Sequence, residues 1–154
     1  MFFATLAVHI VAGLTCIVCG AVAALAVKGG PRHIRFARVY LWGLGVVWAS
    51  MSILSAIRWQ QNAPLFAVGS FSFAAALVGY LNRKRRPYLH IAGMGLSYTA
   101  LLTGFYIDNG PHLPLWDQLP TWTYWTLPSL VGVPLIARAI LRRLNRQASK
   151  LTDL

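Results

Sequence analysis

Acidic residues are almost absent from this 154-residue chain, which contains three aspartates and no glutamate. Asp108, Asp117 and Asp153 all lie outside the centres of the long apolar stretches. Ion-coupled transporters usually carry an acid or a broken helix at mid-membrane, and metal sites gather several carboxylate, cysteine or histidine ligands. The shortage of acids therefore disfavours a resident metal ion, and it disfavours ion-coupled transport unless the chain forms an oligomer.

Cysteine is also scarce, and Cys16 and Cys19 both lie inside the first apolar stretch. They offer no disulfide framework. Their CxxC spacing is used by thiol oxidoreductases, but at mid-span no loop or helix N-terminus is available to activate a thiol, so we expect packing cysteines. No Lys or Arg precedes Lys28, so the positive start of a cleaved signal peptide is missing and the first stretch is expected to persist.

What the chain has in abundance is apolar sequence, with 57% hydrophobic and only 11% charged residues. A soluble fold of this size cannot bury so much apolar surface. About 20 apolar residues suffice for a helix to cross a hydrocarbon layer of roughly 30 Å. The sequence predicts an all-α membrane bundle with five spans, which are residues 3–27, 39–57, 64–81, 89–107 and 122–141.

The basic residues predict the orientation of this bundle. Of the 14 Lys and Arg residues, 13 fall in the first and third loops and at the C-terminal end, whereas Arg58 stands alone in the second loop. By the positive-inside rule the 13 are cytoplasmic, which places the N-terminus outside. We expect a transmembrane domain over residues 1–142 and a short basic cytoplasmic tail over 143–154. Because the charges sit in short loops, nucleic-acid binding is not expected.

A weak internal repeat links the first and third loops. Residues 28–34 and 84–91 both read as basic residues, a proline, a spacer and then His-Ile. If helices one and two correspond to helices three and four, the halves are related by an axis along the membrane normal. His33 and His90 would then face a shared cytoplasmic vestibule. Arg35, Arg38 and Arg86 would make this vestibule attractive to anions or lipid headgroups.

Histidine is the one ionisable type whose placement suggests chemistry. His9 and His112 lie toward the outside, and His33 and His90 toward the cytoplasm. Membrane b-type cytochromes hold haem between paired imidazoles from different helices, so two layers of histidines are compatible with haem b. The alternatives are ordinary interfacial histidines beside glycines that serve helix packing, or a metal ion near His33 and His90. Ser97 is a weak candidate nucleophile, because no histidine lies deep in the bilayer to act as its base.

A family resemblance rests on residues between His9 and about Trp116. They are His9, Gly13, Gly20, Ala24, Leu25, Lys28, Gly29, His33, Val39, Tyr40, His90, Met94, Ser97 and Tyr98. With these residues the chain resembles bacterial predicted membrane proteins grouped as domain of unknown function 2306. Ala37 stands where that family has a glycine. The resemblance implies a bacterial inner-membrane bundle without a settled activity, and its histidine-bearing helices are similar to those of two-haem membrane cytochromes.

Two functional hypotheses follow from the sequence. The first is a b-type haem-binding redox, electron-transfer or accessory protein that uses His9, His33, His90 and His112 as candidate ligands. The second is a non-enzymatic small-molecule transporter or a structural accessory subunit of a membrane complex. Either protein would work with lipid and with a membrane-protein partner or a second copy of itself.

Overall fold

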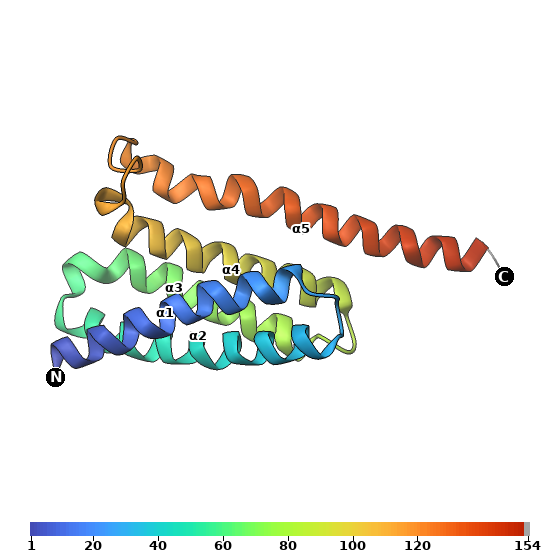
Figure 1. The fold of residues 1–154 in the computed structure, drawn as a ribbon, viewed down its shortest axis with the longest axis horizontal. Coiled ribbons are helices and arrows are strands. Elements are labelled where there is room, and N and C mark those ends of the chain that lie inside the picture. Colours follow the sequence, from blue (N-terminus) through green and yellow to red (C-terminus); the bar gives the residue numbers. More distant parts are fainter. Residues whose placement is uncertain (153–154) are drawn as a thin grey trace. The chain divides into compact units, whose positions relative to one another are not determined.

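The computed structural model describes residues 1–152, with side chains described as far as residue 149. The described residues form helices and no strand (Figure 1). In chain order the elements are α1 (Phe2–Leu25), α2 (Pro31–Ile57), α3 (Trp59–Leu81), α4 (Pro87–Asn109), the short 3₁₀ helix η1 (Gly110–His112) and α5 (Thr121–Thr152).

The predicted all-α class is confirmed, and four of the helices are long and apolar enough to cross a membrane. These four are α1, α2, α3 and α5. The chain is therefore a multi-pass membrane protein by the length and composition of its helices. The remaining long helix, α4, is as long as α3 at 23 residues but contains more hydroxyl-bearing side chains.

Two helix starts are set by proline. Pro31 and Pro87 are the first residues of α2 and α4, where a missing N–H costs no intrahelical bond. The first loop also contains Gly29 at a φ of +79°, a conformation that suits glycine. The predicted second span began at residue 39, but α2 begins eight residues earlier, so three arginines assigned to a loop are helical.

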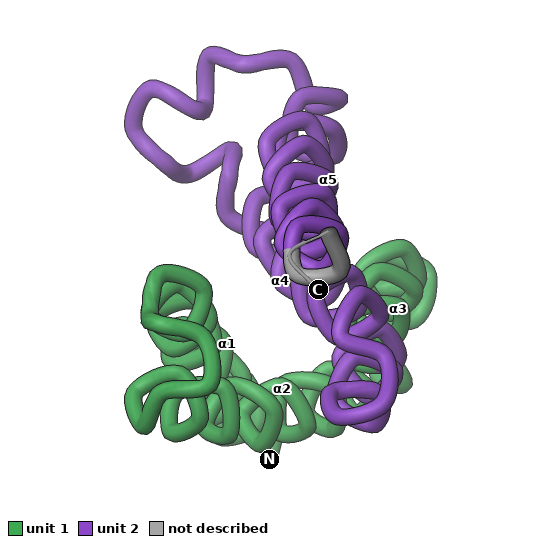
Figure 2. The backbone as a smooth tube through the Cα atoms, turned by 90° about the vertical axis from the view of Figure 1, so that its right-hand side faces the viewer, with its two compact units in different colours: residues 1–73 green, residues 74–154 purple. Residues whose placement is uncertain are grey.

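The structure divides into two compact units, residues 1–73 and 74–154 (Figure 2). The boundary falls within α3, whose first part belongs to unit 1. Unit 1 also contains α1 and α2, and unit 2 contains the end of α3 together with α4, η1 and α5.

In unit 1, α1 and α2 run antiparallel and share a tight core. Cys16 is fully buried, and its Sγ donates a hydrogen bond of 3.6 Å to the carbonyl of Tyr40. A Cβ atom on Gly43 would lie 2.8 Å from the same sulfur, so the glycine permits this close packing. The first part of α3 packs on α2, where the Trp48 ring stacks on Phe73 with centroids 5.3 Å apart.

In unit 2, α4 and α5 run antiparallel. Gly95 faces Ile136, and further along Gly110 faces Tyr124. The connection between the two helices is fixed by Tyr124, whose hydroxyl donates to the Trp116 carbonyl over 2.7 Å. The described residues of the predicted basic tail, 143–152, continue α5 without interruption, and residues 153 and 154 lie outside the described residues.

Candidate functional site

His33 ties the start of α2 to the end of α1. Its Nδ1 lies 2.9 Å from the carbonyl oxygen of Ala23. Ala23 belongs to the last turn of α1, where carbonyls have no intrahelical N–H to accept from. Because a carbonyl only accepts, Nδ1 must be the donor. The neutral imidazole of His33 therefore has its lone pair on Nε2.

His90 makes the equivalent bond in unit 2. It lies in the first turn of α4, and its Nδ1 is 3.0 Å from the carbonyl oxygen of Gly79 near the end of α3. The two helices approach closely here, because a Cβ on Gly93 would lie 2.7 Å from the Gly79 Cα and 2.6 Å from the Ala75 oxygen. His90 is thereby fixed in the same tautomer as His33, with its donor on Nδ1 and its lone pair on Nε2.

A basic side chain also donates a hydrogen bond to a carbonyl at each of these helix ends. Lys28 Nζ donates to the Ala23 oxygen over 3.1 Å and also to the Ala24 oxygen. Arg83 Nη1 donates to the Tyr80 oxygen over 2.9 Å, and its guanidinium lies 4.0 Å from the centre of the Tyr80 ring. Cations are favourable at the negative end of a helix dipole. Partial burial nevertheless lowers the pKa of Lys28.

His9 is held inside the α1–α2 pair. Its Nδ1 lies 3.0 Å from Ser50 Oγ, and the Ser50 hydroxyl is within 2.8 Å of the Val46 oxygen and 3.0 Å of the Val47 oxygen. The hydroxyl has one proton, so His9 Nδ1 donates to Ser50 when that proton goes to a carbonyl and accepts from Ser50 when it does not. His33 and His90, whose partners are carbonyls, donate through Nδ1.

His112 differs from the other three histidines. It ends η1, and its side chain is exposed. It lies in the connection between α4 and α5 and not along a long helix. Of the four predicted site residues, it is the least fixed by its surroundings.

Neither unit brings two imidazoles together. On α1, His9 lies 14 residues before Ala23, the partner of His33, which corresponds to about 21 Å at 1.5 Å per residue. On α4, Asn109 lies 19 residues after His90, so η1 begins roughly 28 Å from that histidine. An iron with two imidazole ligands therefore cannot be held by one unit alone.

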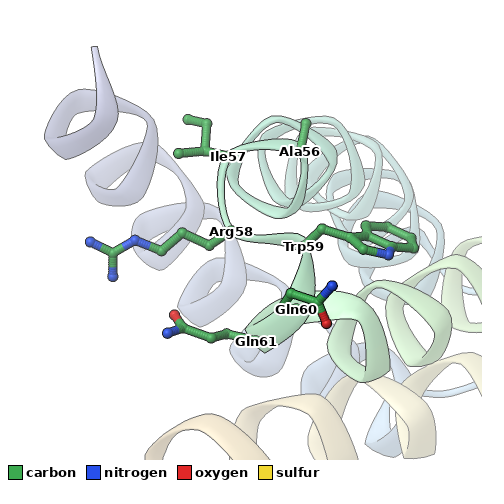
Figure 3. A pocket seen from close by; sticks show the side chains of 6 residues that line it. All are labelled: Ala56, Ile57, Arg58, Trp59, Gln60 and Gln61. Carbon is green, nitrogen blue, oxygen red and sulfur yellow. The ribbon is translucent and has the colours of Figure 1, made fainter.

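Other candidate centres find little support in the described residues. No group of three or more His, Cys, Asp or Glu side chains there is close enough to hold a metal ion. Cys16 and Cys19 are both free and buried. A shallow pocket at the α2–α3 junction is lined by six consecutive residues, 56–61, and Figure 3 shows Arg58 and Trp59 pointing to opposite sides. No set of polar groups converges in it.

Sequence reasoning did not identify the partners of the histidines. Ala23 and Gly79 contribute backbone oxygens, which every residue type has, so no residue pattern marks them. Ser50 carries a detectable signal, because antiparallel pairing that joins residue 23 to residue 33 also brings residue 9 near residue 50. Lys28 was recognised as a loop cation but not as a second donor to the Ala23 oxygen.

No family model, no curated protein and no solved structure matches this chain. The resemblance to domain of unknown function 2306 therefore stays a prediction.

Proposed function

We propose that the chain crosses the bacterial inner membrane five times, with α4 as the additional span. α4 lies beside α5 from the Gly95–Ile136 contact to the Gly110–Tyr124 contact. Because α5 is apolar enough to span, a helix packed along this length has the same membrane depth.

The polar residues of α4 are compatible with this depth, because they are turned inward. Ser97 is fully buried, and Thr99 and Thr103 are buried as well. Thr99 Oγ1 donates to the Gly95 oxygen and Thr103 Oγ1 to the Thr99 oxygen, each over 3.0 Å. Hydroxyls that are buried and bonded to their own helix are tolerated in a membrane. Five crossings and the basic loops then place the N-terminus outside and the C-terminus in the cytoplasm.

Within this bundle we propose a haem b protein in which His33 and His90 would be the principal ligands and His9 a third candidate. The observation that carries this proposal is that His33 and His90 each donate through Nδ1 to a backbone carbonyl at the end of the preceding helix. Metal-ligating histidines almost always donate the N–H of the non-ligating nitrogen to a carbonyl, carboxylate or water, which fixes the tautomer and orients the ligating nitrogen. His33 and His90 make this bond to backbone carbonyls, and His9 Nδ1 pairs with the hydroxyl of Ser50.

Bound haem would supply one-electron transfer between partners at the membrane. In this function the chain's own residues hold and orient the imidazoles. Ala23 and Gly79 keep the proton of each ring on Nδ1, and Lys28 shares the Ala23 oxygen. His112 has no comparable placement, so we expect it to be the least important of the four histidines.

The test is the absorption spectrum of purified protein after expression with added haem. We expect a Soret band and an α band that sharpens on reduction, because two imidazoles give low-spin iron. The sharpest variants are His33→Asn and His90→Asn. The asparagine amide reproduces the Nδ1 donor but has nothing at the Nε2 position, so the helix-end hydrogen bond survives while the ligand is lost. Each variant should lose haem and remain folded.

Lys28→Met is the matched control. It removes a donor from the same Ala23 oxygen without removing a candidate ligand, so haem content should stay at the wild-type level. Wild-type protein that remains colourless after haem supplementation would refute haem binding. Full haem retention in both asparagine variants would show that His33 and His90 are not ligands.

A structural accessory subunit is the second candidate function. The observation that favours it is that the bonds of His33 and His90 are sufficient as helix-end caps without any cofactor. In that case His33→Asn and His90→Asn would resemble wild type in stability, the alanine variants would be less stable, and none of the proteins would be coloured.

A further inference from the structure

α5 is longer than a membrane requires. Its 32 residues correspond to about 48 Å, more than the roughly 40–45 Å of a bilayer with its headgroups. Residues 121–141 alone cover the hydrocarbon layer of about 30 Å. The next turn of the helix therefore lies at the depth of the lipid headgroups.

The helix around this boundary carries a basic face, which we define as Arg138, in the last turn before residue 141, and Arg142, Arg143 and Arg146, in the turns after it. All four side chains are exposed. Arg138, Arg142 and Arg146 are spaced by four residues, so they follow one another along one side of the helix. Like charges at this spacing repel one another, and α5 contains no Asp or Glu from Thr121 to Thr152 to neutralise them.

We propose that the basic face binds the phosphate groups of anionic phospholipids in the cytoplasmic leaflet. A guanidinium matches phosphate oxygens with two parallel N–H donors, and a juxtamembrane cluster of four or more cations is typical of anionic lipid recognition. Arg138 lies about one turn deeper than Arg142 and reaches the same level by extending its side chain toward the headgroups. The depth of the face favours lipid over a soluble anion or a nucleic acid. The proposal does not depend on haem.

The test is native mass spectrometry of the full chain in a neutral detergent, titrated with phosphatidylglycerol and with phosphatidylcholine of the same acyl chains. Wild-type protein should prefer phosphatidylglycerol. The quadruple variant R138Q/R142Q/R143Q/R146Q should reduce this preference by at least about fivefold. The corresponding quadruple lysine variant keeps the charge but loses the paired N–H donors of the guanidinium. Its preference for phosphatidylglycerol should therefore lie between those of wild type and the glutamine variant.

The matched control sets K84Q/R85Q in the α3–α4 loop against R142Q/R143Q in the basic face, because each removes two charges and the loop variant leaves Arg83 and Arg86 in place. The loop variant should change the lipid preference by less than about twofold, and the basic-face variant should change it by more. An equal loss in the two double variants would show binding by net charge alone and overturn the proposal, as would no loss in the quadruple glutamine variant of the basic face. Displacement of phosphatidylglycerol by inorganic phosphate would identify a soluble-anion site instead.

Discussion

The α1–α2 and α3–α4 loops both follow a helix whose last carbonyl groups need hydrogen-bond donors, but the two loops have different sequences. Each is five residues long, 26–30 and 82–86, and each ends at a proline that begins the next helix. The first contains two glycines and one cation, whereas the second contains four consecutive cations and no glycine. In both, an imidazole and a basic side chain satisfy carbonyls at the end of the preceding helix. The two connections therefore pair these carbonyls with the same kinds of side chain, although their loop sequences differ.

The two helix pairs differ more strongly in how closely they pack. Gly43 on α2 meets the sulfur of Cys16, which is a side-chain atom. Gly93 on α4 meets backbone atoms of Ala75 and Gly79. A side chain can move aside, but a helix backbone cannot move without shifting the whole helix. The α3–α4 crossing should consequently tolerate less change than the α1–α2 crossing.

Of the substitutions that test this comparison, Gly93→Ala should reduce the free energy of unfolding most. The new methyl group would lie less than 3 Å from backbone atoms, so we expect a loss of about 3 kcal/mol in the free energy of unfolding. Gly43→Ala should cost less, about 1 kcal/mol, because the Cys16 sulfur can shift. Denaturant unfolding in a mild detergent, followed by circular dichroism, measures both.

Gly13→Ala is the control for the glycine substitutions. No heavy atom lies within 4 Å of a Cβ built at Gly13, so the change should be neutral or slightly stabilising through higher helix propensity. A Gly93→Ala protein as stable as Gly13→Ala would mean that the close crossing of α3 and α4 is wrong.

The histidine caps should differ by a smaller amount. His90→Ala leaves the Gly79 oxygen without its imidazole donor and should cost about 1–2 kcal/mol. His33→Ala should cost less, because Lys28 Nζ still donates to the Ala23 oxygen. Thermal unfolding of the two alanine variants gives the ranking. The double variant K28M/H33A should bring the cost up to that of His90→Ala, and a double variant no worse than His33→Ala would contradict the shared cap.

The smallest expected effect is the pH dependence that Lys28 gives to the free energy of unfolding. Burial lowers its pKa below the ordinary value of 10.5, so the unfolded chain binds more protons than the folded chain just below that pH. Stability should therefore rise slightly as pH increases through this alkaline window, and Lys28→Gln should abolish that rise. Carbon-13 NMR of labelled lysine follows the titration directly. A Lys28 pKa at or above 10.5 would contradict the assigned burial.

The sequence predicted the helices well but not all of their ends. The start of α2 was placed too late because Arg32, Arg35 and Arg38 interrupt the apolar run. Arginine is nevertheless a good helix former, so the helix continues beyond the apolar layer. For the same reason α5 continues through its arginines to Thr152. Hydropathy indicates the edge of the apolar layer, and a helix can continue beyond that edge.

The site was predicted only in part. The Pro-spacer-His pattern singles out His33 and His90, and in the structure each donates through Nδ1 to a carbonyl near the end of the preceding helix. The Cβ position of Gly13 has no neighbour within 4 Å, whereas Gly93 makes its closest approach to backbone atoms of Ala75 and Gly79. Spacing identifies which face a glycine is on, but only the partner helix decides whether it makes a contact. Haem binding and the internal repeat stay proposals.

The proposal that α4 is a fifth span can be tested directly from the two sides of α4. A reporter active only in the periplasm should be silent when inserted at Lys84, in the α3–α4 loop, active when inserted near Asn109, at the end of α4, and silent again when fused after Leu154. Without α4 as a span, the positions at Lys84 and Asn109 would lie on one side of the membrane and give the same result. Equal activity at these two positions would therefore contradict the fifth span, and the reversed pattern at all three positions would contradict the orientation.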